Sequence, residues 1–215
     1  MEHYVGDRLP GGEADAGESA KMAVRIGRAT RPQAGKNVCV SRCGQWFSGA
    51  RIVLAVTEGQ GHGEEAARNA EAALSCIGKN LDCACEEMFA SCDARLVGTR
   101  GAALAVTIIE PDVGRMTIAS VGNIRALLLR KSCDLRLYGG SGSVGAGYHN
   151  LVPETLALHD GNVLAMFSNG IEKFPMLRGY FGDRSVSAQG QAEAILEHCS
   201  HAADDATVLI YRHET

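Results

Sequence analysis

The sequence predicts an α+β fold in which mostly antiparallel sheets carry helices on their outer faces. Glycine accounts for 26 of the 215 residues and proline for only 5, which favours tight reversals between short strands over a helical bundle. Apolar residues recur along the chain with two periods, one typical of strands and one typical of helices. Hairpin signals dominate, so a layered α+β sandwich fits better than a doubly wound parallel sheet.

The first half of the chain is expected to form a strand pair followed by two helices. Strands over 38–47 and 51–57 meet at Ser48-Gly49, a typical turn dipeptide. After the glycine-rich segment 59–63 the apolar positions fall on one helical face, and a second helix is expected over 85–96. The apolar face of the first helix consists of Ala66, Ala70, Ala73, Leu74, Ile77 and Leu81.

The second half is expected to contain a run of strands, then helices and a final strand. Gly122-Asn123 and Asp160-Gly161 are turn signals, so the strands on either side of each are expected to pair as hairpins. A short helix over 171–177 and a longer one over 187–199 precede the last strand. The strands of this half are expected at 102–109, 115–121, 124–130, 135–138, 154–158, 163–167 and 207–211.

Length and charge indicate one folded domain and argue against two classes of partner. Residues 1–20 are rich in Gly, Glu and Asp and are expected to form a flexible tail, with a single domain over 21–215. The formal net charge of −4 argues against nucleic-acid binding, because phosphates need a basic face. The apolar stretches are shorter than the ~20 residues that span a bilayer, and the chain start does not resemble a secretory signal. We therefore expect no membrane partner, and a cytoplasmic protein that is a monomer.

A glycine motif in the second half allows two interpretations. Residues 140–145 satisfy GxGxxG, which in dinucleotide-binding proteins follows a strand and opens a helix. The residues after it do not begin a helix, so the motif is expected to belong to a mobile loop, 139–150, beside a site.

Oxygen-bearing side chains follow or precede buried strands at three separate places. Glu58 closes one apolar strand, Asn169 closes another, and Asp204-Asp205 stands just before the last one. Each alone is explained by an ordinary turn. Together, beside glycines that allow close backbone approach, they form the kind of oxygen set that hard cations such as Mg²⁺ or Mn²⁺ require.

Three motifs in register resemble those of a known family, the PPM metal-dependent serine/threonine phosphatases. Residues 56–66 (VTEGQGHGEEA) are similar to its V-x-D-G-x-G-H-G-x-x-A, 167–171 (FSNGI) to its S-D-G-I/V, and 204–208 (DDATV) to its D-D-x-T-V. Segments 100–103 (RGAA) and 120–125 (SVGNIR) resemble further family motifs. The resemblance covers about residues 35–212 and is strongest to the bacterial SpoIIE/RsbX branch.

The resemblance implies a four-layer α-β-β-α sandwich with a metal site between the sheets. It implies two ions, Mn²⁺ or Mg²⁺, that clamp a phosphomonoester and activate water. By position, Glu58 replaces the bridging aspartate, the Gly59 carbonyl binds the second metal, and Asn169 stands where an aspartate ligand stands. Asp204 and the adjacent Asp205 complete the metal set, and Glu58 and Asp204 are the catalytic carboxylates. His62 is expected to be part of the helix start and not a catalytic group.

Three positions depart from the family pattern and remove or displace negative charge. Glu58 and Asn169 each replace an aspartate, and Asn37 stands where the family usually has one. Affinity for hard cations rises with ligand charge, so we expect weaker metal binding, or a single ion, and weak activity.

Two functions are consistent with these motifs. The first is a metal-dependent phosphatase that removes phosphate from Ser or Thr of a bacterial stress-signalling protein, such as a scaffold protein of the stressosome. The second is a degenerate phosphatase that binds a phosphorylated partner with little or no turnover. The substitutions at 58 and 169 favour the second, and the retained Asp204-Asp205 and glycine loops favour the first.

Overall fold

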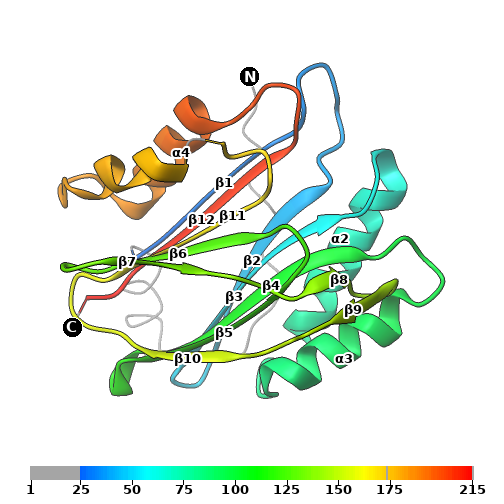
Figure 1. Ribbon diagram of the computed structural model, residues 1–215, viewed down its shortest axis with the longest axis horizontal. Coiled ribbons are helices and arrows are strands. Elements are labelled where there is room, and N and C mark those ends of the chain that lie inside the picture. Colours follow the sequence, from blue (N-terminus) through cyan, green and yellow to red (C-terminus); the bar gives the residue numbers. More distant parts are fainter. Residues whose placement is uncertain (1–24, 173, 215) are drawn as a thin grey trace.

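Two five-stranded antiparallel sheets lie face to face at the centre of the computed structural model, which describes residues 25–172 and 174–214 (Figure 1). Sheet I has the spatial order β1 (Ile26–Arg31), β12 (Ala206–Arg212), β11 (Val163–Phe167), β6 (Arg125–Leu129), β7 (Asp134–Leu137). Sheet II has the order β10 (Glu154–Ala157), β5 (Arg115–Val121), β4 (Ala102–Glu110), β3 (Arg51–Gly59), β2 (Ser41–Ser48).

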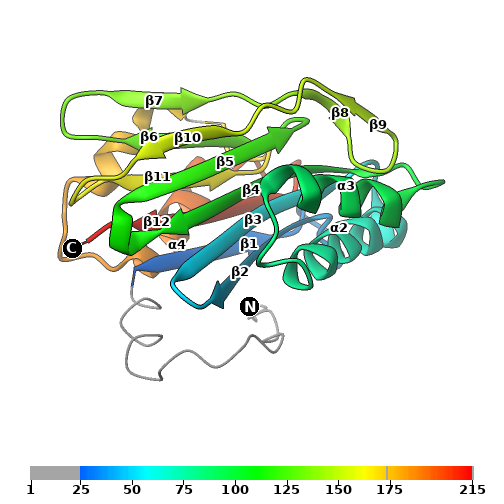
Figure 2. The same ribbon diagram turned by 90° about the horizontal axis from the view of Figure 1, so that it is seen from below.

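Helices cover the outer face of each sheet, as Figures 1 and 2 show. Helices α2 (Gly63–Gly78) and α3 (Cys85–Leu96) share an apolar cluster with sheet II. Helix α4 (Ala188–Cys199) and the 3₁₀ helix η2 (Phe174–Phe181) lie over sheet I. The predicted four-layer α-β-β-α sandwich is therefore confirmed. The remaining short elements are η1 (Pro111–Val113), β8 (Ser141–Ser143) and β9 (Gly147–His149).

Strand β4 shows why a central strand of this fold is almost entirely apolar, with Thr107 as the one polar residue among its first eight. Its first eight residues are all buried. Ala103, Ala105 and Ile109 face the interior between the sheets, whereas Leu104 and Val106 face helices α2 and α3. Because successive side chains point to opposite faces, a strand covered on both sides has no solvent-facing position.

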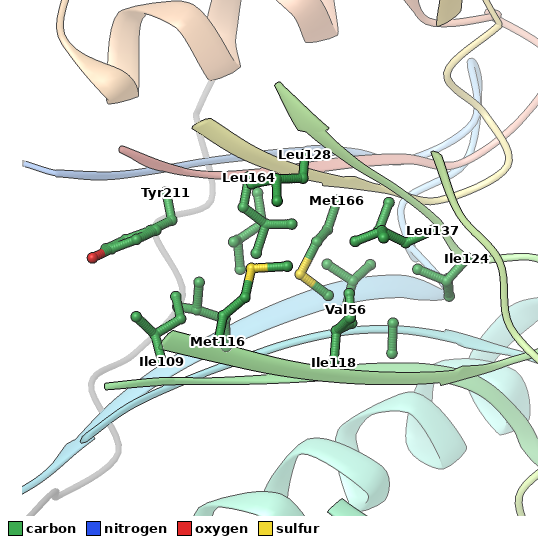
Figure 3. Packing of buried hydrophobic residues seen from close by; sticks show 14 of the residues in the cluster. Val56, Ile109, Met116, Ile118, Ile124, Leu128, Leu137, Leu164, Met166 and Tyr211 are labelled. Carbon is green, nitrogen blue, oxygen red and sulfur yellow. The ribbon is translucent and has the colours of Figure 1, made fainter. Parts of the chain in front are cut away.

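The interior between the sheets is packed with large aliphatic and sulfur-containing side chains (Figure 3). Met116 and Ile118 point up from β5 toward Leu164 and Met166 of β11. Each of these side chains is at most 4% exposed, and burial of such a side chain stabilises the fold by about 1.5–3 kcal/mol. This packing holds the two sheets together, so the strand ends of one sheet lie next to the strand ends of the other.

Two predicted hairpins are wrong. Gly122-Asn123 joins β5 of sheet II to β6 of sheet I, and Asp160-Gly161 lies between β10 of sheet II and β11 of sheet I. Both glycines have positive φ, as turn glycines do. A turn dipeptide reverses the chain locally, but it does not determine whether the next strand pairs with the last one or crosses to the other sheet.

Other differences concern single elements. Strand β1 was not among the expected elements because IGRATR is half polar, and its pairing with β12 places it in sheet I. The short helix expected over 171–177 is the 3₁₀ helix η2, which begins at Phe174. Segment 139–150 contains the β8–β9 hairpin and no helix. The expected flexible tail, residues 1–20, lies outside the described residues.

No helix in the described part of the chain combines the length and the apolar character that crossing a membrane requires.

Candidate functional site

The candidate site lies where β3 and β11 end and β12 begins. Glu58, the penultimate residue of β3, receives a hydrogen bond at Oε2 from the backbone N–H of Asn169 over 3.3 Å. Asp204 lies close enough for its charge to act on Glu58. Glu58, which lies in sheet II, is therefore close to Asn169 and Asp204, which flank strands of sheet I. All three were proposed from the sequence as site residues.

Close backbone packing joins the end of β11 to the start of β12. A Cβ on Gly170 would lie 2.2 Å from the carbonyl oxygen of Asp205, so only glycine fits there. Ser168 adds two hydrogen bonds: its N–H donates to the Thr207 carbonyl over 3.1 Å, and its Oγ accepts from the Thr207 N–H over 2.9 Å. The Ser-Asn-Gly sequence thus fixes Asn169 beside the Asp204-Asp205 pair.

Glu58 is a partly buried carboxyl group with two donors. Burial raises its pKa, the hydrogen bonds from Asn123 and the Asn169 amide lower it, and the charges of Asp204 and Asp205 raise it again. The net effect is a raised pKa, so the charged form is less stable than in water. Asn123 Nδ2 donates to Oε1 over 3.2 Å. A cation placed beside Glu58 would offset the negative charge that opposes its ionisation.

Asn169 is bound by an arginine in addition to its contact with Glu58. Arg125 Nη2, at the start of β6, donates to the Asn169 carbonyl oxygen over 2.9 Å and to Oδ1 over 3.1 Å. Oδ1 is the atom that would coordinate a metal. The guanidinium therefore competes with a metal for that oxygen and brings a positive charge beside Asn169.

Asp205 has a different environment from its neighbour. It is 8% exposed, its Oδ1 accepts from the Gln33 N–H over 2.7 Å, and its Oδ2 accepts from the Val40 N–H over 3.1 Å. Both carboxylate oxygens thus hold the segment between β1 and β2. Asp204 is more exposed, and its Oδ1 accepts from the Asp205 N–H over 2.9 Å.

The glycine loop after β3 leads directly into helix α2. A Cβ on Gly59 would lie 1.8 Å from the carbonyl oxygen of Ala66, so the absence of a side chain lets the strand end lie against the first turn of α2. His62 is the N-cap residue of α2, and its side chain makes no capping hydrogen bond. This placement agrees with its expected position at the helix start.

We expect the donor set to suit one hard cation better than two. Among residues 25–172 and 174–214, no group of three or more His, Cys, Asp or Glu side chains is arranged to hold a metal ion. Asp205 uses both carboxylate oxygens to accept backbone hydrogen bonds, whereas Glu58 and Asp204 do not. The two formal negative charges of Glu58 and Asp204 balance one divalent ion. The Gly59 carbonyl and the Asn169 amide can add neutral oxygens.

Three residues of this site were not among the predicted site residues: Asn123, Arg125 and Ser168. Asn123 and Arg125 belong to the segment SVGNIR and Ser168 to FSNGI, so the motifs contained them. Their roles depend on contacts with Glu58, Asn169 and Thr207, which lie 65, 44 and 39 positions away. Short motifs do not report such contacts.

The sequence is similar to one protein family over most of its length. The sequence matches the family profile "Stage II sporulation protein E (SpoIIE)" over residues 48–214. A search of curated protein sequences found no match.

Several solved structures have a similar fold. One, from "The bacterial stressosome: a modular system that has been adapted to control secondary messenger signaling", is 28% identical with a TM-score of 0.83, covering 87% of this chain and 98% of that one. A crystal structure of RsbX in complex with magnesium is 19% identical with a TM-score of 0.78, covering 86% of this chain and 92% of that one. The PP2C phosphatase domain of SpoIIE from Bacillus subtilis is 18% identical with a TM-score of 0.73, covering 88% and 61%.

The family profile extends from β3, which contains Glu58, to β12, which follows Asp205. The similar structures share the two-sheet sandwich around it. The chain belongs to the SpoIIE family and has the fold of PP2C-type phosphatases.

Proposed function

We propose that this protein is a metal-dependent phosphatase that acts on phosphoserine or phosphothreonine of a bacterial regulatory protein. The observation that carries the proposal is the convergence of Glu58, Asn169 and Asp204 at one edge of the sandwich. Membership of the SpoIIE family and the 28% identical structure from work on the stressosome support a stress-signalling scaffold as the substrate. In this proposal the protein acts as a monomer in the cytoplasm.

The cation is proposed to be Mg²⁺ or Mn²⁺, held by Glu58, Asp204, the Gly59 carbonyl and the Asn169 amide. The magnesium found in RsbX supports this choice. Such an ion polarises a phosphoryl oxygen and lowers the pKa of bound water. Because both oxygens of Asp205 accept backbone hydrogen bonds, we give Asp205 the task of positioning residues 33–40 around the site.

The neighbouring side chains orient the ligands. Asn123 holds one oxygen of Glu58 and the Asn169 amide holds the other, so the carboxylate has a fixed direction. The Arg125 guanidinium donates two hydrogen bonds to Asn169. A guanidinium in that position attracts the phosphate dianion of a substrate and also opposes a second metal ion.

The test measures phosphate release by the purified protein from p-nitrophenyl phosphate and from a phosphoserine peptide. We expect release with Mn²⁺ or Mg²⁺ and none with EDTA. Asp204→Ala should abolish it, whereas Asp112→Ala, which removes an exposed carboxylate in η1 far from the site, should not. No release with either ion would contradict the enzymatic proposal.

The alternative is a phosphoprotein-binding module with little or no turnover. The observation that favours it is the Arg125–Asn169 contact, which replaces an acidic metal ligand by a neutral, arginine-bound one. If the phosphoserine peptide binds but releases no phosphate with either ion, the alternative holds.

A further inference from the structure

A cavity of about 340 Å³ opens at the start of β6 and the end of β7, on the sheet I side of the candidate site. The residues of its lining that matter here are Asn123, Arg125, Arg136, Leu137 and Tyr138. Strand β7 is the edge strand of sheet I, and its end leads into the connection to β8 (Figure 2). Because Leu137, Tyr138 and Gly139 line the cavity, it lies at this margin of the sheet.

The cavity adjoins the site directly. Asn123 lines it and donates to Glu58, and Arg125 lines it and donates to Asn169. A chain segment lying in the cavity would therefore lie beside Asn123 and Arg125, the two residues that contact Glu58 and Asn169. The cavity is thus placed to contact the residues that flank a phosphoserine bound at the site.

The charged side chains that line the cavity are all positive. Its lining includes two guanidinium groups, Arg125 and Arg136, and no Asp or Glu. In the register of β6 and β7, Arg136 lies opposite Leu127, two residues after Arg125. The two arginines therefore lie on the same face of the sheet, on neighbouring strands.

An exposed aromatic side chain stands beside these charges. Tyr138 is 82% exposed, whereas Leu137, one position earlier, is buried in the core between the sheets. An exposed tyrosine next to arginine is a common composition for a protein-binding surface, because both side chains contribute strongly to interfaces.

We propose that this cavity binds an acidic segment adjoining the phosphoserine of the substrate protein. The proposal rests on the proposed function, because it extends the same site. Arg136 and Arg125 recognise carboxylates of the segment, and Tyr138 packs against its backbone or an apolar residue. The net charge of −4 of the whole chain disfavours a nucleic acid as the ligand, although the cavity itself is basic.

The experiment measures binding of two fluorescein-labelled phosphoserine peptides by fluorescence anisotropy in EDTA, so that no hydrolysis occurs. The peptides are identical except that Asp and Glu on both sides of the phosphoserine in one are Asn and Gln in the other. We expect the acidic peptide to bind about fivefold more tightly at low salt, and the preference to shrink as salt is added.

Variants identify the residues responsible. Arg136→Glu should abolish or reverse the preference, and Tyr138→Ser should weaken binding of both peptides. Lys131→Glu is the matched control: it makes the same charge change on an exposed residue in the β6–β7 turn, away from the cavity, and should keep the preference. Thermal melts of all variants confirm that they are folded. Equal affinities for the two peptides, or a preference that survives Arg136→Glu, would overturn the proposal.

The outcome is separable from that of the proposed function. A preference for the acidic peptide without phosphate release under Mn²⁺ or Mg²⁺ supports the cavity and rejects the phosphatase. Phosphate release that occurs equally from both peptides, with equal affinities, supports the phosphatase and rejects the cavity.

Discussion

The two sides of the site are built differently. On the sheet II side, Glu58 is held by side-chain and backbone donors at 3.2 and 3.3 Å, and a glycine loop runs from it into α2. On the sheet I side, the ends of β11 and β12 are crowded: Gly170 lies against Asp205, and Ser168 binds Thr207 twice. The sheet II side presents the Glu58 carboxylate, whereas the sheet I side presents the Asp204 carboxylate at the edge of a rigid backbone frame.

From this difference between the two sides, we infer which side limits the affinity of the site for a cation. The sheet II side retains its carboxylate, although as Glu58. On the sheet I side, Asn169 is bound by Arg125 and Asp205 is bound by backbone amides, which leaves Asp204 as the acidic ligand. We therefore expect the Asn169 position, on the sheet I side, to lower the affinity for a cation more than Glu58 does.

The largest expected effect comes from removing the acidic ligand of sheet I. Asp204→Ala should lower metal-dependent phosphate release at least about 100-fold, because a cation would keep Glu58 as its sole carboxylate ligand. The unfolding midpoint should change little, since Asp204 is partly exposed. Steady-state kinetics with Mn²⁺ measures the first and thermal melting the second. Unchanged turnover would remove Asp204 from the mechanism.

The rigid frame of sheet I can be tested through Gly170. Gly170→Ala places a Cβ 2.2 Å from the Asp205 carbonyl oxygen, and the strain should lower the free energy of unfolding by about 2–3 kcal/mol. Gly182→Ala is the control, because nothing lies within 4 Å of its Cβ position. Urea denaturation measures both. Equal stability of the two variants would show that β11 and β12 can separate at this point without cost.

Restoring the acidic ligands should sharpen the contrast between the two sides. Glu58→Asp combined with Asn169→Asp adds one negative charge and should tighten Mn²⁺ binding about tenfold and raise the phosphatase rate. Asn150→Asp adds the same charge at an exposed position outside the site and should not. Isothermal titration calorimetry gives the affinities. If the double variant binds Mn²⁺ no better than the natural protein, the assignment of positions 58 and 169 is wrong.

The smallest expected effect lies at the other end of sheet I, where His213 follows β12. His213 is 1% exposed, burial lowers its pKa below 6.5, and the charge of Arg25 lowers it further. The unfolded chain binds a proton at His213 more readily than the folded chain does. The contribution of neutral His213 to the free energy of unfolding is therefore complete above pH 6.5, and it decreases as the pH falls from there toward the pKa of the folded state.

His213→Gln should therefore reduce this acid sensitivity, so that the free energy of unfolding falls less as the pH drops below 6.5. Chemical denaturation at a series of pH values from 7 downward measures the slope of the unfolding free energy. Exposed His149, replaced by Gln in the β8–β9 hairpin, is the control that should leave the slope unchanged. A slope equal to that of the natural protein would place the acid-sensitive groups elsewhere, including at the site end of the sheet.

The amino-acid sequence by itself determined the local elements and the residue types of the site. The nearly continuous apolar run of β4 and the helical period of α2 are properties of neighbouring residues. Glu58, Asn169 and Asp204 were identified because each stands at the end or beginning of an apolar strand, next to glycine or a second acid. The family motifs supplied their order.

Only the tertiary structure decided which strands share a sheet and which partners the site residues have. Gly122-Asn123 has the residues of a hairpin turn, yet it carries the chain from sheet II to sheet I. Arg125 binds Asn169, which lies 44 positions away in the sequence. Asp205 binds the segment before β2, which lies at least 165 positions away. Local patterns report the energy of a turn or a strand, whereas these pairings depend on how the two sheets bury their shared faces.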